Sequence, residues 1–177
     1  MGIIGFSFLS EAQGQAVDNS SKRILVAYFS CTGTTERVAN AIAEAVDGTL
    51  YRITPAKPYT SADLDWRNKN SRSSVEMADE KSRPELDGET INASEYDIIF
   101  LGYPIWWDLC PRPVNTFLDK YSFSGKTVIP FATSGGSSIT GSVKQLKKLY
   151  PKIGWKEGRL CNGSMKQAED WARQVIK

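Results

Sequence analysis

Apolar runs alternate with helical patterns from residue 23 to the end of the chain. The stretches 23–30 (RILVAYFS), 96–102 (YDIIFLG) and 127–133 (TVIPFAT) are nearly continuous in apolar, β-branched and aromatic residues, which is typical of strands covered on both faces. The stretch 49–54 (TLYRIT) alternates polar and apolar residues, and 158–162 is short. These two are expected to be edge strands.

Helical spacing of apolar residues follows every predicted strand except the second. Asp47-Gly48 ends the first of these helices. The apolar positions are Val38, Ala41, Ile42, Ala45 and Val46, then Val114, Phe117, Leu118 and Tyr121, then Val143, Leu146 and Tyr150, and finally Met165, Ala168, Ala172, Val175 and Ile176. Strands that alternate with helices predict right-handed crossovers and a mostly parallel sheet.

We therefore predict a doubly wound α/β fold, in which a five-stranded parallel sheet is the middle layer of a three-layer α/β/α domain. Apolar strands in the centre and polar strands at the edges fit the strand order 2-1-3-4-5. Pro130 removes a ladder hydrogen bond from the fourth strand, so we expect a bulge or local break there. Residues 55–95 are too long and too polar for a simple crossover, and we expect an irregular surface excursion that contains a helix.

The domain is expected to span residues 23–177, after a leader at residues 1–22. Ile3 to Leu9 is an apolar run too short to cross a bilayer, which needs about 20 residues, so no integral membrane segment is expected. Two interpretations of residues 1–16 stay open: the remnant of a signal peptide without a basic n-region, or a disordered segment. The first implies an exported protein and the second a cytoplasmic one.

The absence of histidine is the feature of the composition that most limits the possible catalytic chemistry. The 177 residues include no histidine, which excludes Ser-His-Asp and Cys-His catalytic sites. The net charge of +2 gives no field for nucleic acid, which is not expected as a partner. Cys31, Cys110 and Cys161 are too widely spaced to indicate a zinc site or disulfide framework, and no metal is expected. We expect any chemistry to belong to a cofactor.

The loop after the first strand is rich in hydroxyl groups and glycine. Ser30-Cys31-Thr32-Gly33-Thr34-Thr35 leads directly into a helix, so backbone N–H groups, hydroxyls and the helix dipole could together bind a phosphate. The loop carries neither lysine nor arginine, which excludes a Walker-type loop. The alternative is ordinary helix capping by Thr34 or Thr35. Cys31 is interpreted as a small packing residue, with a redox-active thiol as the alternative.

Two further loops follow the third and fourth strands, at the same predicted edge of the sheet. Gly102 to Pro111 contains the adjacent indoles of Trp106 and Trp107. Indoles in a loop favour a flat apolar partner such as a planar ring system, although packing under the loop or a protein interface would also explain them. Thr133 to Ser138 (TSGGSS) lets backbone amides approach a polar ligand closely. The three loops are expected to meet around one crevice.

These three loops resemble those of the flavodoxin-like FMN-binding proteins. The resemblance covers residues 23–177 and rests on SCTGTT, GYPIWW and the Ser-Gly-Gly loop in that order. It implies that FMN is the cofactor, with its phosphate in the first loop, its isoalloxazine beside the second and its pyrimidine edge on the third. The implied cofactor-binding residues are Ser30, Thr32, Gly33, Thr34, Thr35, Pro104, Ile105, Trp106, Trp107, Asp108, Ser134, Gly135 and Gly136.

The sequence departs from acidic electron-carrying flavodoxins in three ways. Glu36 and Asp108 near the loops are balanced by Arg37, Arg112 and Lys144, so we expect a flavin potential less negative than in those relatives. Asp108 also replaces a glycine that such carriers commonly have, and it tolerates unusual backbone angles less well than glycine. The third loop has no aromatic residue, so the second face of the flavin is expected to be open to a substrate.

Three functions stay open at this point. The first is an FMN-binding redox protein that passes electrons to a partner protein or to a small planar acceptor. The second is an NAD(P)H-dependent FMN reductase of quinones or similar planar molecules, which the open face and balanced charge favour. The third is a flavin-free binding domain on the same fold. A signalling domain of this third class that accepts a phosphoryl group would need an acidic cluster at the end of the first strand. Ser30 and Cys31 occupy those positions instead.

Overall fold

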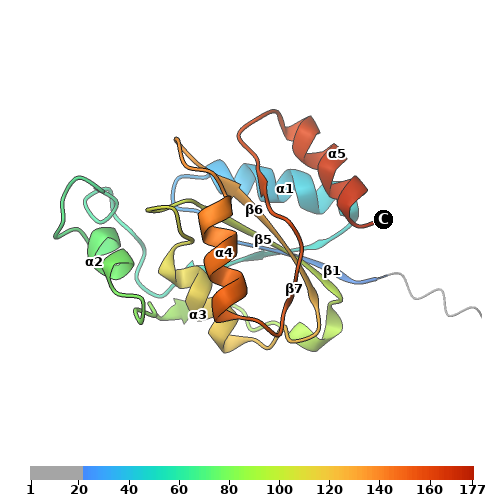
Figure 1. Ribbon diagram of the computed structural model, residues 1–177, viewed down its shortest axis with the longest axis horizontal. Helices are drawn as coiled ribbons and strands as arrows, with labels where there is room; N and C mark the ends of the chain where they lie inside the picture. The colour runs from blue at the N-terminus through green and yellow to red at the C-terminus, as the bar shows by residue number, and fades with distance from the viewer. Residues whose placement is uncertain (1–21) are drawn as a thin grey trace, which may run out of the picture.

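A parallel β-sheet forms the middle layer of the computed structural model, which describes residues 22–177 (Figure 1). The strands are β2 (Thr49–Arg52), β1 (Ile24–Tyr28), β5 (Ile98–Pro104) and β6 (Thr127–Thr133) in spatial order, followed by β7 (Gly154–Trp155) and β8 (Arg159–Leu160), which both pair with β6. The predicted order 2-1-3-4-5 is confirmed, with the fifth position shared by two short strands.

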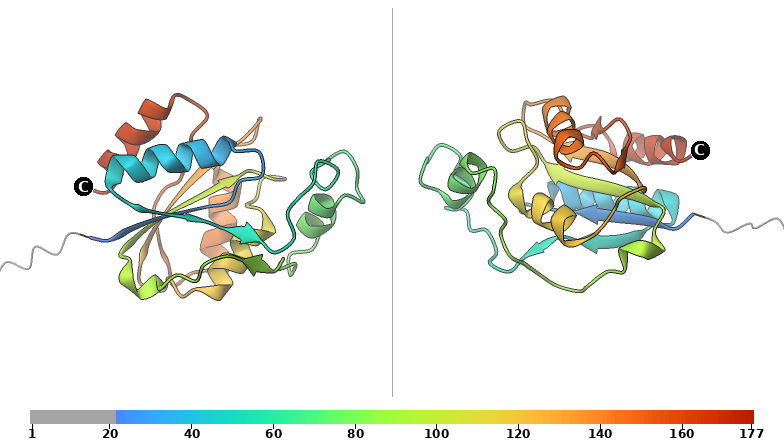
Figure 2. Two further views of the ribbon diagram at one scale, coloured as in Figure 1. Left: turned by 180° about the vertical axis from the view of Figure 1, so that it is seen from behind. Right: turned by 60° about the horizontal axis from the view of Figure 1, so that its bottom comes forward.

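Helices cover both faces of this sheet, as a doubly wound fold requires (Figure 2). α1 (Thr34–Val46) and α5 (Met165–Val175) lie on one face, and α3 (Arg112–Lys120) and α4 (Thr140–Leu149) lie on the other. Successive residues of a strand point to opposite faces, so β1 contributes Val26 to the core under α1 and Leu25 to the core under α3.

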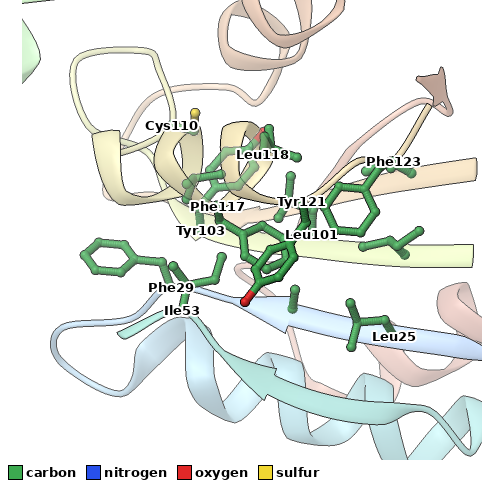
Figure 3. Close-up of a cluster of buried hydrophobic side chains, with 14 of the residues drawn as sticks. Leu25, Phe29, Ile53, Leu101, Tyr103, Cys110, Phe117, Leu118, Tyr121 and Phe123 are labelled. Atoms are coloured by element: carbon green, nitrogen blue, oxygen red, sulfur yellow. The ribbon is translucent and has the colours of Figure 1, made fainter. Parts of the chain in front are cut away.

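The core under α3 is rich in aromatic rings (Figure 3). Phe117 lies at its centre, with ring centroids 5.3 Å from both Tyr121 and Phe123 and 5.6 Å from Tyr51 of β2. Tyr103 of β5 is fully buried, and its hydroxyl group lies 3.0 Å from the hydroxyl of Ser142 on α4. These contacts fix α3 and α4 against the strands that lead to the predicted loops.

The bulge or local break predicted in the fourth strand at Pro130 does not occur, so that prediction was wrong. β6 pairs with β5 without interruption from Thr127 to Thr133. The N–H of Thr127 faces β5, whereas the carbonyl oxygens of Val128 and Ala132 accept hydrogen bonds from the edge strands. The backbone groups of successive residues in β6 point alternately to β5 and to the edge strands, so those of Pro130 point to the edge strands. The N–H that proline lacks would therefore fall in the gap between β7 and β8.

Residues 55–95 form the expected excursion with a helix. It begins within β3 (Thr54–Pro55), which pairs antiparallel with β4 (Leu86–Asp87). α2 (Arg72–Ala78) lies between these two strands, and the short 3-10 helix η1 (Ala93–Glu95) precedes β5. α2 stands out beside the carboxyl ends of the central strands (Figure 1). The leader predicted at residues 1–22 lies outside the described residues, apart from residue 22. Among the residues described, none of the helices is long and apolar enough to span a bilayer.

Gly102 of β5 is required by the ring of Phe131 on the neighbouring strand. A Cβ atom at Gly102 would lie only 2.1, 2.4 and 2.8 Å from three carbon atoms of that ring, which is well below the van der Waals contact distance. Phe131 is itself fully buried in the core under α1. The close approach of the ring to the backbone of β5 therefore depends on glycine at this position.

We expect Gly102→Ala to lower the free energy of unfolding by about 2 kcal/mol, because a methyl group overpacks the core between β5 and β6. Urea unfolding measures the change. Gly136→Ala is the matched control, since a Cβ atom there meets nothing within 4 Å. In the Gly102→Ala background, Phe131→Leu should destabilise less than it does alone. Additive effects of the two changes would contradict the steric explanation.

Candidate functional site

The three predicted loops meet at the carboxyl edge of the sheet around one cavity of about 430 Å³. The register of the strands brings them together, because Gly102 pairs with both Tyr28 of β1 and Phe131 of β6. Each loop therefore begins at the same level of the sheet. The residues that line this crevice are Ser30, Cys31, Thr32, Thr34, Thr35, Leu64, Pro104, Ile105, Trp106, Thr133, Ser134, Gly135 and Asn162.

Most of the predicted cofactor-binding residues line the crevice, and four do not. Trp107 lines a neighbouring cavity of about 220 Å³. Gly33, Asp108 and Gly136 lie in the same loops but outside the lining of both cavities. Gly33 adopts the positive φ at the start of α1, and the N–H of Gly136 donates to the hydroxyl of Ser134. Asp108 lies in a tight turn that is described below.

The loop after β1 leaves the first turn of α1 without a side-chain cap. Gly33 is the N-cap residue, with a φ of 85° that favours glycine, and no side chain caps the helix there. The N–H of Gly33 donates to the hydroxyl oxygen of Ser30 at 3.2 Å, which closes the loop. The alternative of capping by Thr34 or Thr35 is therefore not what the structure shows. The amide groups of the first turn and the surrounding hydroxyls form a cradle suited to an anion.

Thr35 has a structural role as well as a place in the lining. Its hydroxyl group lies 2.9 Å from the hydroxyl of Thr133 at the end of β6, and both residues are buried. This pair joins the first loop to the third across the crevice. Thr133 was not predicted as a site residue, although its position as the last residue of the fourth strand was a usable signal.

Arg52 at the end of β2 is a further residue that the sequence analysis missed. Its guanidinium group donates to the carbonyl oxygen of Ser30 at 3.3 Å and forms an ion pair with Glu36 at 3.3 Å. The hydroxyl of Tyr28 also donates to Glu36 at 2.9 Å. A positive charge therefore lies behind the first loop, paired with the one carboxylate that the first turn of α1 carries. The position of Arg52 near the end of a predicted edge strand, at the carboxyl side of the sheet where the three loops were expected to meet, could have indicated this role.

Burial changes the chemistry expected of Cys31. Loss of solvent around this residue raises the pKa of the Cys31 thiol to about 11, although the nearby Arg52 guanidinium acts in the opposite direction. A thiol with a raised pKa carries little thiolate at neutral pH and is a poor nucleophile. The structure thus favours the interpretation of Cys31 as a small residue that packs beside the loop.

The second loop places its two indoles in different surroundings. Trp106 and Leu109 exchange two backbone hydrogen bonds of 2.9 Å, and the two residues between them, Trp107 and Asp108, have φ values of 46° and 61°. This is the geometry of a type I′ turn, which usually contains glycine or asparagine. Trp106 packs edge-to-face on Phe29, with centroids 5.6 Å apart, whereas Trp107 remains 46% exposed.

Asn162 orders the third loop through both ends of its side-chain amide. Its Oδ1 accepts from the N–H of Ser134 at 3.0 Å, and its Nδ2 donates to the carbonyl of Ser134 at 2.6 Å. The hydroxyl of Ser134 in turn accepts from the N–H groups of Gly136 and Ser137 at 3.1 and 2.8 Å. Asn162 follows the last predicted strand directly, but its role depends on a contact 28 residues away.

Leu64 reaches the crevice from the excursion, which the sequence analysis treated only as surface. It lines both the crevice and the neighbouring cavity. The crevice therefore includes an aliphatic side chain from a segment other than the three loops. The crevice combines a polar end, formed by hydroxyls and free amides, with an apolar end at Leu64, Ile105 and Trp106.

Comparisons with known proteins agree with this arrangement. Residues 23–175 match the sequence model of the flavodoxin family. A protein from Bacteroides eggerthii assigned as a flavoprotein is 57% identical, with a TM-score of 0.84 over 89% of this chain and 99% of the other. A second such protein, from Bacteroides uniformis, is 56% identical, with a TM-score of 0.83 over 86% of this chain and 98% of the other.

A more distant structure shares the fold. It is a flavoprotein in complex with FMN from Lactobacillus acidophilus, 21% identical, with a TM-score of 0.68 over 86% of this chain and 99% of the other. A search of curated proteins gives no match. The family match spans almost all of the described residues, including the three loops and the sheet that carries them. The chain therefore belongs to the flavodoxin family.

Proposed function

We propose that this protein binds FMN in the crevice and transfers electrons through it. The observation that carries the proposal is the pairing of an uncapped helix start with an indole-lined apolar end in one cavity of about 430 Å³. A phosphate needs N–H and hydroxyl donors, and a tricyclic ring needs flat apolar contacts. The family membership and the FMN complex of the Lactobacillus acidophilus relative support the same cofactor.

In this proposal each loop contacts a different part of the cofactor. The first loop holds the phosphate through hydroxyls and backbone amides, with the Arg52 charge behind it. The segment from Pro104 to Trp107 flanks the isoalloxazine, and Trp106 is the indole that faces the crevice. The segment from Ser134 to Gly136 meets the pyrimidine edge, with its backbone held in place by Asn162 and by the Ser134 hydroxyl. Bound FMN supplies reversible uptake of electrons, and the chain supplies position and exclusion of water.

A reductase of planar acceptors is the second candidate. The observation that favours it is the cavity lined by Trp66 and Trp107 directly beside the crevice, which gives room for a second molecule. A carrier exchanges electrons with a partner protein, whereas a reductase consumes NAD(P)H by itself.

We predict that the protein without flavin binds FMN at least tenfold more tightly than riboflavin, which lacks the phosphate. Thr34→Val should weaken FMN binding about tenfold and leave riboflavin binding unchanged, because it removes one hydroxyl donor to a charged group. Quenching of flavin fluorescence on titration measures both affinities. Thr140→Val is the matched control, since Thr140 also begins a helix but lies outside the crevice. Equal affinity for both flavins in the wild type would contradict the assigned phosphate site.

We predict that Cys31 is alkylated about 100-fold more slowly at neutral pH than a cysteine with the ordinary pKa of 9, because its pKa of about 11 reduces the thiolate fraction by that factor. The rate should rise with pH up to about pH 11. Iodoacetamide labelling followed by peptide mass spectrometry measures Cys31 separately from Cys110 and Cys161. Bound FMN should slow the reaction further. An unusually fast rate would support the redox-active thiol instead.

The electron-transfer function predicts a specific pattern of reduction. FMN-loaded protein should be reduced by dithionite and reoxidised by cytochrome c, and should not oxidise NADH or NADPH by itself. Absorbance at the flavin band follows the first pair of reactions, and absorbance of the nicotinamide follows the second. Continuous NAD(P)H oxidation that requires added 1,4-naphthoquinone would instead establish the reductase.

A further inference from the structure

The cavity beside the crevice is built from the excursion on one side and the second loop on the other. Its volume is about 220 Å³, and it is lined by Leu64, Trp66, Ser73, Ile105, Trp106 and Trp107. Leu64, Ile105 and Trp106 also line the crevice, so the two cavities share one wall. A molecule in this second cavity would lie next to the apolar end of the proposed flavin site.

Two indoles in this cavity lack the burial that large aromatic side chains usually have. Trp66 is 70% exposed and Trp107 is 46% exposed, and both are among the large apolar side chains most open to solvent. Exposed apolar surface that gathers at a concave site is typical of a binding site. Trp107 also has a φ of 46°, which is a strained conformation for a bulky residue. The turn thus holds this indole at the cavity at a cost in backbone energy.

A nearly buried polar network holds the wall of the cavity that the excursion forms. Arg72 and Glu76 form an ion pair of 2.6 Å with side chains only 17% and 13% exposed. The hydroxyl of Tyr59 donates to Glu76, and the guanidinium of Arg72 lies 3.9 Å from the centre of the Tyr59 ring. Tyr59 packs edge-to-face on Trp106, with centroids 5.5 Å apart. The network therefore joins α2 directly to the indole that separates the two cavities.

A second anchor holds the other end of α2. Arg112 is 1% exposed, and its guanidinium donates to the carbonyl oxygens of Glu76 at 3.2 Å and Met77 at 2.8 Å. These carbonyls lie near the C-terminal end of α2, where the helix dipole favours a positive charge. Arg72 of α2 and Arg112 of α3 both hold this short helix in place. The excursion is therefore a fixed wall, which preorganises the cavity for its occupant.

The lining determines what kind of molecule fits. None of the six lining residues is ionisable, and Ser73 is the one polar side chain among them. A charged ligand would lose its hydration without gaining a partner. Flat indole faces instead favour stacking on an aromatic ring. The small volume excludes a folded partner but accommodates a bicyclic ring system.

We propose that this cavity binds an uncharged planar aromatic molecule, held between Trp66 and Trp107 and separated from the flavin site by Ile105 and Trp106. The position beside the flavin rests on the proposed function, whereas the binding itself does not. Planar quinones are electron acceptors of this shape, and a quinone bound here would lie next to the apolar end of the proposed flavin site.

The test uses 2-naphthol, an uncharged planar probe that carries no reactive quinone. Isothermal titration calorimetry measures its binding to the full chain with and without FMN. We expect binding in both forms, and Trp66→Ala should weaken it at least tenfold in both. Trp66→Phe should retain most of the affinity because it keeps an aromatic face. Val75→Ala is the matched control, since Val75 is an exposed residue of α2 that does not line the cavity. Its effect should stay within twofold.

The other possible results distinguish a failure of this inference from a failure of the proposed function. Equal naphthol binding by the wild type and Trp66→Ala, or no binding at concentrations of about 1 mM, would overturn the inference. Competition between naphthol and FMN, together with weaker FMN binding by Trp66→Ala, would also overturn it, because the cavity would then belong to the flavin site. Naphthol binding without any FMN binding would support the cavity and contradict the proposed function instead.

Discussion

The register of three parallel strands is the constraint on which the site depends. Tyr28, Gly102 and Phe131 lie in one row across β1, β5 and β6. Because the strands are parallel and in register, their loops leave the sheet at one level and on one edge. A shift of one residue in any of these strands would exchange its two faces and move its loop away from the others. The close packing of the Phe131 ring on Gly102 ties this register to the core.

The central part of the fold and most of the crevice could be predicted because their signals are local. Continuous apolar runs such as Ile24 to Phe29 identify buried strands, and the composition of the loops after them indicates a phosphate and a flat ring. The prediction of a break at Pro130 was wrong for a different reason, because β6 continues through this residue. Backbone hydrogen bonds of successive residues in a strand alternate between its two neighbours. The sequence pattern does not reveal whether the backbone at Pro130 points to β5 or to the edge strands.

The excursion shows a more general limit. Its residues are largely polar, so hydropathy places it on the surface, yet Arg72, Glu76 and Tyr59 are largely withdrawn from water around α2. Burial and the hydrogen bond to Glu76 raise the pKa of the Tyr59 hydroxyl, which keeps it a donor. Polar side chains become interior residues only when partners from other segments meet them. The pairing of Arg112 with α2 across more than thirty residues is such a contact.

Several departures from ordinary local rules lie near the carboxyl edge of the sheet. Helix α1 begins without a side-chain cap, Trp107 and Asp108 occupy a turn that favours glycine or asparagine, and Trp66 lies largely in solvent. Elsewhere the strands alternate between two well-packed cores. A bound ligand can offset the free-energy cost of these features through donors and flat surfaces already in place. The same physical reasoning therefore links the anion cradle, the strained turn and the exposed indoles to binding rather than to folding.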